Sequence, residues 1–470
     1  MADNETRLSL TRPTPLDIIA FIPYACYQME AQFEVRVLTR VKKEYVSVSE
    51  KNKKTKRERS IMQYTSTARM SQEKEKTESQ LAFGVTDHSQ MVLIIAICDS
   101  AGHLVELLFQ RTSVPQLLLE VIGFCLPYQP YLNRITIRWG AIDGYSIYEI
   151  TKHLRQSHIT EICLDDSPVA HYNQYLLLEY QTNLKYLSLE RCGLVDRDCI
   201  RIAAQLVYPQ PASRTLRVLS LASNTITNDG AIALGSMLRS NRQLRFLNLS
   251  GNQISDSGAA AIFSSLMEFP MTYDEIVSKR ARSIEYLNRQ KEVYIKCYKE
   301  LLNTPVAKSL DDRGSGKKRS VRPKRQSTTA LITNSEPLSP TDNIASKAKK
   351  MTFDLIGPNN ETFCARDTIR KDSYLYSIGN LSLSYLNLSY NNLGHESLVK
   401  LLRVIRYQES LKCKTAEVGL VRVMVEGNPM PSRSCELEAI QDFTYCIGMS
   451  GTQFTQVKCE KLKPMKLGKR

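Results

Sequence analysis

The sequence lacks the short motifs that most often mark an enzyme or a metal site. Its twelve cysteines include no C-x-x-C pair and no cysteine/histidine group with zinc spacing. No G-x-S-x-G nucleophile motif occurs. The stretch Gly314–Lys318 departs twice from the phosphate-binding loop pattern, with Asp311 in place of glycine and Lys318 in place of serine or threonine. We therefore expect no catalytic centre, no cofactor and no metal.

Long apolar runs are also missing. The longest is Met91–Cys98, far shorter than the roughly 20 residues that a membrane-spanning helix needs. No apolar run precedes Thr11, so the sequence predicts no signal peptide. Together with the scattered cysteines, these observations predict a reduced, intracellular and cytoplasmic protein with no membrane contact.

The net charge of +15 is concentrated in three segments rather than spread over the chain. Residues 41–60, 304–350 and 455–470 carry local excesses of +5, +7 and +5, so the remainder is close to neutral. The densest basic segment could be a nuclear localisation signal or could bind an acidic surface such as tubulin or RNA, and its alternative interpretation is a solvated linker. That segment consists of Lys317, Lys318, Arg319, Arg322, Lys324 and Arg325.

One motif recurs along the chain. Leu244–Ile254 reads L-x-x-L-x-L-x-x-N-x-L, which is the pattern of one leucine-rich repeat. Matching stretches begin at Leu132, Ile159, Leu184, Leu216, Leu383 and Leu420, some with conservative replacements. The first five starts, at 132, 159, 184, 216 and 244, are 27, 25, 32 and 28 residues apart. These spacings predict one strand and one helix in each repeat, and the gap before Leu383 predicts a large insertion.

The sequence therefore predicts an α/β leucine-rich-repeat solenoid with a parallel concave sheet and convex helices. We expect the repeat at Leu383 to stack directly on the repeat at Leu244, because both would otherwise leave an apolar face exposed. The expected segments are a mostly disordered N-terminus with a charged linker (1–83), a hairpin and helix cap (84–130), repeats (131–270), a long charged helix (271–303), a largely disordered basic insertion (304–380), further repeats (381–450) and a basic tail (451–470).

The helical parts of the repeats carry a resemblance to a known family. Asp229–Leu238 and Asp256–Leu266 have the D-x-G-A-x-A-L character of leucine-rich-repeat proteins of the ribonuclease-inhibitor subtype. The expected cap and the run Met267–Arg280 also resemble a family in which a repeat helix leads into a charged helix and a low-complexity insert. That resemblance implies a non-enzymatic scaffold linked to cilia or axonemes.

Side chains that alternate away from the core should line the concave face, where this fold usually binds partners. Aromatic residues at three of these positions favour a protein partner, because aromatics anchor many interfaces. The alternatives are that these aromatics only pack sideways along the sheet or against the chain's own insertion. The candidate binding residues are Tyr186, Ser188, Val218, Phe246, Asn248, Tyr385 and Asn387.

Two other functions stay open at this stage. One is the regulation of a small GTPase, which would need an exposed arginine in a strand-to-helix loop, where Arg191 and Arg197 lie. The other is nucleic-acid binding through the basic segments, since the concave positions themselves are not strongly basic. We interpret Cys192, Cys199, His153 and His158 as structural residues.

Overall fold

The computed structural model describes residues 12–42, 90–168, 173–303, 340–359, 361–412, 419–431 and 433–449. The chain forms two compact units. We call them the solenoid unit, which runs to Met267 and resumes at Asn380, and the insertion unit, Glu268–Gly379.

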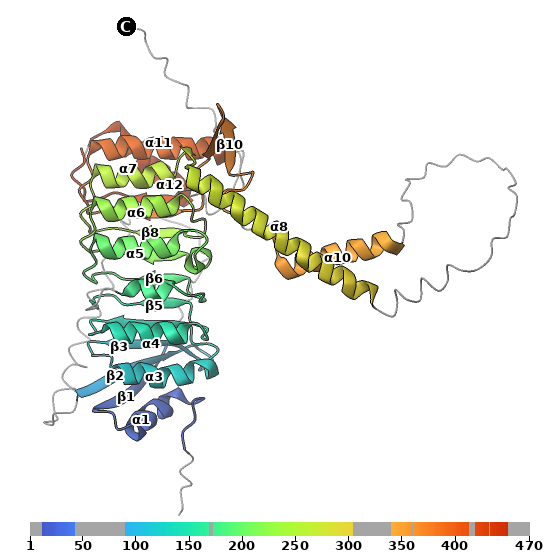
Figure 1. The fold of residues 1–470 in the computed structure, drawn as a ribbon. Coiled ribbons are helices and arrows are strands. Elements are labelled where there is room, and N and C mark those ends of the chain that lie inside the picture. Colours follow the sequence, from blue (N-terminus) through green and yellow to red (C-terminus); the bar gives the residue numbers. More distant parts are fainter. Residues whose placement is uncertain are drawn as a thin grey trace, which may run out of the picture. The chain divides into compact units, whose positions relative to one another are not determined.

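A single sheet runs the length of the solenoid unit (Figure 1). Neighbouring strands are parallel except for β2 and β3, which form the predicted hairpin. The predicted stacking of the Leu383 repeat on the Leu244 repeat is confirmed, because β8 pairs directly with β12. In spatial order the strands are β1 (Phe33–Val41), β2 (Gln90–Cys98), β3 (Leu104–Gln110), β4 (Arg134–Arg138), β5 (Glu161–Cys163), β6 (Tyr186–Ser188), β7 (Val218–Ser220), β8 (Phe246–Asn248), β12 (Tyr385–Asn387) and β13 (Arg422–Met424).

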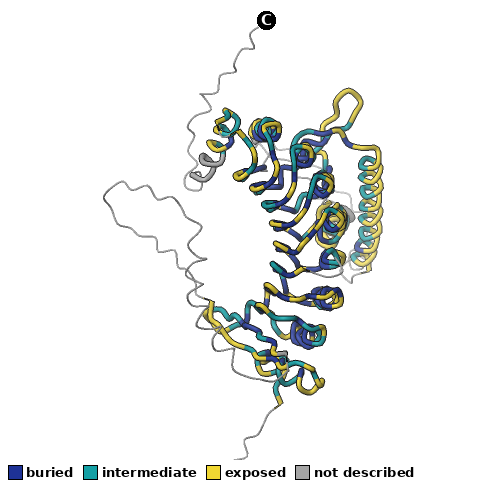
Figure 2. Tube along the Cα trace, turned by 90° about the vertical axis from the view of Figure 1, so that its left-hand side faces the viewer, coloured by how far each residue is buried: buried dark blue, intermediate teal, exposed yellow. Residues whose placement is uncertain are grey.

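Helices cover one face of this sheet, and the strands line the inner side of the curved array (Figure 2). The expectation of one α-helix per repeat is wrong for the connection from β5 to β6, whose described helical part is the short 3-10 helix η2. The helical elements are α1 (Ile18–Gln28), α3 (Gln116–Cys125), η1 (Leu126–Tyr128), α4 (Gly144–Leu154), η2 (Gln174–Leu178), α5 (Asp196–Leu206), η3 (Pro211–Arg214), α6 (Asn228–Leu238), α7 (Asp256–Ser265), α11 (His395–Lys412) and α12 (Cys435–Met449).

The core follows the repeat motif residue by residue. Leu244, Leu247, Leu249 and Ile254 are completely buried, as are Leu383, Leu386, Leu388 and Leu393 across the insertion. Each such side chain contributes about 1.5–3 kcal/mol through the removal of apolar surface from water. The repeat on either side of the insertion therefore needs the other to cover its apolar face.

In the repeats that carry the motif asparagine, its side chain joins neighbouring repeats through hydrogen bonds to the backbone. The Asn252 side-chain amide donates to the carbonyls of Leu221 and Leu249, and its oxygen accepts from the Ile226 amide at 3.1 Å. The oxygen of Asn391 accepts in the same way from the Ile254 amide at 3.1 Å. These bonds pair buried backbone groups that the turns leave without a backbone partner.

A second set of side chains caps the convex helices α6, α7 and α11, each from the preceding repeat. Asp196 accepts hydrogen bonds from the amides of Thr227 and Gly230, at the start of α6. Asn228 plays the same part for α7, and Asp256 for α11. A first-turn Asp or Asn thus caps the helix of the next repeat, and the charge of Asp196 and Asp256 also faces the positive end of that helix.

The boundary predicted at residue 84 is wrong for the described N-terminal residues. Helix α1 and strand β1 belong to the solenoid, because β1 pairs in parallel with β2 over its full length and Ile18 and Ile22 are core residues. The pairing joins strands about 50 residues apart in the sequence, so local patterns gave no sign of it. The rest of 1–83 lies outside the described residues.

The insertion unit is more ordered than the sequence predicted. The long helix is confirmed as α8 (Tyr273–Leu302), which begins at a capping box between Thr272 and Glu275. The prediction of a largely disordered 304–380 is wrong for its second half, which contains α10 (Pro340–Ile356), β10 (Thr368–Lys371) and β11 (Tyr374–Ser377). With β9 (Phe269–Pro270) these strands make a small antiparallel sheet. The core of this unit consists of Phe269 and Met271, which precede α8, and Phe363, which follows α10.

Within the described ranges, no helix combines the length and apolar character that crossing a membrane requires.

Candidate functional site: the concave face of the solenoid

The concave face consists of two aligned columns of side chains that alternate with the core residues of each strand. Backbone pairing places the members of a column directly beside one another. The first column is Arg134, Glu161, Tyr186, Val218, Phe246, Tyr385 and Arg422. The second column is Thr136, Cys163, Ser188, Ser220, Asn248, Asn387 and Met424. Both columns continue across the point where the insertion interrupts the sequence.

An aromatic pair lies in the first column at that point. The rings of Phe246 and Tyr385 stack with centroids 4.0 Å apart and planes 6° from parallel. The Arg422 guanidinium lies 6.0 Å from the Tyr385 ring centroid, and the Tyr385 hydroxyl donates to the Met424 sulfur. Both rings are half-buried, so part of this stacked pair stays accessible on the concave face. We name Phe246, Tyr385 and Arg422 the aromatic platform.

Tyr186 and Val218 extend this surface along the same column. Tyr186 is half-buried, and its burial is the main cause that raises the pKa of its hydroxyl to about 12. The phenol is therefore neutral near pH 7 and serves as an apolar body with a hydrogen-bonding tip.

The second column is polar, and much of its hydrogen-bonding capacity is used within the protein. The Ser188 hydroxyl, 1% exposed, donates to Asp165, so Ser188 supports the groove wall and offers almost no contact surface. The Asn248 amide donates to the Ser220 hydroxyl. The Asn387 side-chain oxygen accepts from the Ser389 amide.

Carboxylates flank these columns at the carboxyl ends of the strands. Asp165 accepts from Ser188 and from the Glu190 amide, while Glu190 accepts from Ser220 at 2.6 Å. Glu426 accepts from Ser389. These carboxylates have neutral hydrogen-bond donors, whereas Glu161 at the N-terminal end of the column is already paired with Arg134. Glu190 and Glu426 could therefore accept a basic group of a partner, alongside the Arg191 guanidinium, whose pKa is raised by Asp166 first and also by Glu190 and Asp165.

Sequence reasoning missed an apolar area at the N-terminal end of the concave face. Leu38, Ile95 and Leu108 are paired with one another and then with Thr136, so they extend the second column. Leu38 is 44% exposed, Leu108 is half-buried and Ile95 is buried. The run Met91–Cys98 could have indicated this apolar area, because its residues are apolar on both faces of the strand although only one face packs against the core.

Of the two residues considered for GTPase regulation, Arg191 lies in a loop that follows a strand, whereas Arg197 lies in the first turn of α5 and not in the expected loop. Arg191 has a left-handed backbone (φ 53°), and its guanidinium donates two hydrogen bonds to Asp166, one at 2.7 Å. The hydrogen bond from Arg191 is the main reason why the pKa of Asp166 lies below its ordinary value. Arg197 lies 4.0 Å from Asp198. The Arg191 guanidinium is thus engaged by a carboxylate of its own chain.

The surroundings of Cys192, Cys199 and His153 are typical of structural residues. The Cys192 thiol donates to the Leu164 carbonyl, and burial raises its pKa to about 12. Burial also raises the pKa of Cys199 and lowers that of His153, whose Nε2 is 3.5 Å from Glu149. Among the described residues, no group of three or more His, Cys, Asp or Glu side chains is arranged to hold a metal ion. The basic segment Lys317–Arg325 lies outside the described residues.

Comparison with known protein families agrees with this architecture. A family model described as "Leucine Rich repeat" matches residues 212–235, 240–263 and 379–402. The second and third matches are the repeats on either side of the insertion. The fold and these matches define a leucine-rich-repeat solenoid. No curated protein matches the chain.

Proposed function

We propose that this protein is a non-enzymatic interaction scaffold that binds a protein partner on the concave face of its solenoid unit. The observation that carries the proposal is the aromatic platform, whose Phe246 and Tyr385 rings form a stacked, half-buried pair near the C-terminal end of a continuous concave face. Such a pair gives a partner a large apolar contact at little cost in side-chain entropy, because neighbouring strands already hold both rings.

The partner that suits this groove is a protein segment with apolar and basic side chains. An apolar side chain would cover the Phe246 and Tyr385 rings, and lysine or arginine would reach Glu190 or Glu426. The apolar area at Leu38 and Leu108 would contact a second part of the same partner. Charge attraction would raise the association rate and make it sensitive to salt, while the aromatic contacts would supply most of the affinity.

A pull-down with matched variants tests this proposal. The groove variant is Tyr186→Ala/Phe246→Ala/Tyr385→Ala in the full chain. The control variant is Ile200→Ala/Val207→Ala/Ile232→Ala, which removes exposed apolar residues from the opposite, convex side. Thermal unfolding of each purified variant shows that the solenoid is intact before capture is compared.

We expect the groove variant to lose proteins that both the wild type and the convex variant retain. Identical partner sets for all three would show that the concave aromatics do not bind. Nuclease treatment of the wild-type sample separates a second possibility, because loss of all bound proteins would assign binding to nucleic acid and the basic segments.

Two narrower assignments rest on resemblance alone. The helical pattern supports the ribonuclease-inhibitor subtype, and the cap with the run Met267–Arg280 supports a relation to the family of leucine-rich repeat-containing protein 71. We propose a ciliary or axonemal location on that basis, which imaging of the tagged protein in ciliated cells would test. We do not extend the proposal to GTPase regulation, because Asp166 holds the Arg191 side chain.

A further inference from the structure

Helix α8 of the insertion unit has two different faces. Its inner face packs on α10 and the segment that follows it. Arg282 forms a bidentate ion pair with Glu361 at 2.7 and 2.8 Å, the Tyr286 hydroxyl donates to the Gly357 carbonyl, and Cys297 is 1% exposed. These contacts hold α8 within its unit and leave its other face turned outward.

The outer face carries apolar residues at the spacing of a coiled coil. One set of positions repeats every seven residues from Val277, and the second set lies four residues after each member of the first. Four of the eight positions are exposed apolar side chains: Val277 (42%), Ile284 (60%), Ile295 (43%) and Leu302 (43%). We name the whole set the outer seam, consisting of Val277, Ala281, Ile284, Asn288, Lys291, Ile295, Tyr298 and Leu302. A stripe of this kind normally faces a second helix.

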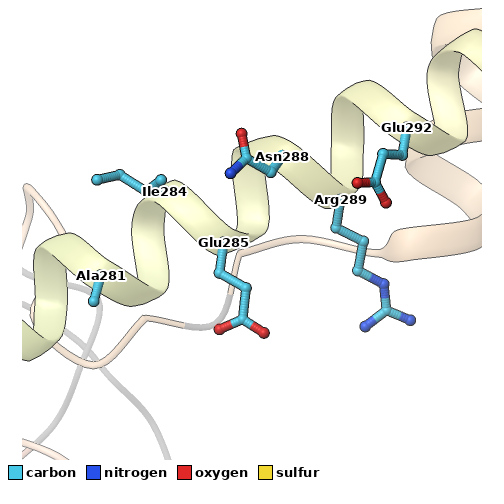
Figure 3. Close-up of a pocket in the computed structure, with 6 residues that line it drawn as sticks. All are labelled: Ala281, Ile284, Glu285, Asn288, Arg289 and Glu292. Carbon is cyan, nitrogen blue, oxygen red and sulfur yellow. The ribbon is translucent and has the colours of Figure 1, made fainter.

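Figure 3 shows the middle of the outer seam. Ile284 and Asn288 lie along one side of α8, with Glu285 and Arg289 on the adjacent side, and a hollow of about 650 Å³ lies beside them. The small side chain of Ala281 also borders this hollow. The hollow spans one edge of the seam, because Ala281, Ile284 and Asn288 of the seam border it together with Glu285, Arg289 and Glu292.

We propose that the outer seam binds the outer seam of a second copy of this chain, with the two α8 helices antiparallel. In this orientation the seam is complementary to itself about a two-fold axis. Ile284 faces Ile295 of the second copy, and Val277 faces its Leu302. The small Ala281 faces the large Tyr298, and the polar Asn288 faces Lys291. Each of these pairs occurs twice, as an isologous contact requires.

A parallel orientation of the same two helices would match the sizes and the charges of the facing side chains less well. It would place Lys291 against Lys291 in the seam, Ala281 against Ala281 and Tyr298 against Tyr298. The antiparallel pairing instead joins polar with polar and small with large. It also brings Leu287, 59% exposed at the edge of the seam, next to Tyr294 of the second copy.

Charges at the seam edge limit the strength of this contact. The antiparallel pairing brings Glu285 near Glu292 of the second copy, which opposes association, and Lys291 of each chain lies between these carboxylates and offsets part of the repulsion. The Asn288–Lys291 layer also costs stability relative to an apolar layer while fixing the register of the helices. We therefore expect a reversible dimer.

Sedimentation equilibrium of the full chain measures the association. Ile284→Asp places a carboxylate in the central apolar layer and should weaken the dimer at least tenfold. Leu355→Asp is the matched control, because Leu355 is 68% exposed on α10 and lies outside the seam. Asn288→Leu/Lys291→Leu replaces the polar layer and should strengthen the dimer about tenfold. Circular dichroism confirms that each variant retains its helices.

Disulfide trapping then determines the orientation. Mixing the Ile284→Cys chain with the Ile295→Cys chain should link residue 284 of one copy to residue 295 of the other, as identified by peptide mass spectrometry, with the unmixed variants and the wild type as background.

A wild-type chain that stays monomeric at about 100 µM would overturn the proposal. So would a dimer that Ile284→Asp leaves unchanged, or trapping of 284–284 and 295–295 links in place of 284–295.

Discussion

Phe246 and Tyr385 stack at 4.0 Å although the whole insertion unit lies between them in the sequence. Their strands are directly paired, so the insertion interrupts the sequence of the solenoid and leaves its sheet continuous. The aromatic platform exists only because the repeat after the insertion returns to the repeat before it.

Replacement of residues 268–379 by a short glycine-serine linker should leave the solenoid unit folded. The chain leaves and returns at adjacent points, where the Asn380 amide donates to the Ser265 carbonyl at 2.9 Å. We expect a thermal midpoint within a few degrees of the full chain's solenoid transition, measured by calorimetry. Leu386→Ala, at a completely buried position, should instead cost about 2–5 kcal/mol. A deletion as damaging as that substitution would show that the insertion supports the array.

Asn252→Ala should destabilise the solenoid unit by about 2–3 kcal/mol, because it leaves buried backbone groups, including the Ile226 amide, without a partner. Gln253→Ala is the neighbouring control, since Gln253 is exposed. Urea unfolding compares the two free energies of unfolding. Equal values for both variants would mean that the asparagine positions are not structural.

The repeat motif predicted the solenoid well because every motif position has a local physical role. Buried leucines, the turn asparagine and the concave alternation at Tyr186, Phe246 and Tyr385 all follow from the spacing within one repeat. The sequence could not predict β1 as a sheet strand or β10 and β11 as partners of β9, because distant segments supply their pairing. It also could not predict that the Ser188 hydroxyl donates a hydrogen bond to Asp165, since that bond joins two repeats.

Asp256 should make stability depend on pH in the acidic range. Burial raises its pKa, but hydrogen bonds from Ser397 and Gly394 outweigh that effect and leave the pKa below its ordinary value. Because the unfolded-state pKa is higher, at about 3.9, the contribution is complete above that value and is lost as pH falls through the folded-state pKa. Asp256→Asn keeps an acceptor oxygen without the charge. Its deficit in the free energy of unfolding should be constant from about pH 5 to 7 and shrink below about pH 4; a deficit that grows in acid would contradict this assignment.

The buried cysteines should resist alkylation in the folded protein. Burial raises the pKa of Cys163 to about 11 and that of Cys192 to about 12, so neither forms much thiolate near neutral pH. Cys435 is exposed and should react with iodoacetamide at pH 8 before Cys163 and Cys192, as followed by peptide mass spectrometry. Early labelling of Cys192 would indicate that its repeat opens readily.

Site-specific photo-cross-linking in cells tests the concave-face binding site most directly. A photoreactive phenylalanine derivative at position 246 lies in the groove, and the same group at Ile232, 45% exposed on the convex helix α6, is the control. We expect position 246 to link a distinct protein that position 232 does not link, and Tyr385→Ala in the same chain to reduce that product. The same products from both positions, or none from position 246, would contradict the proposal that the concave face is the binding surface.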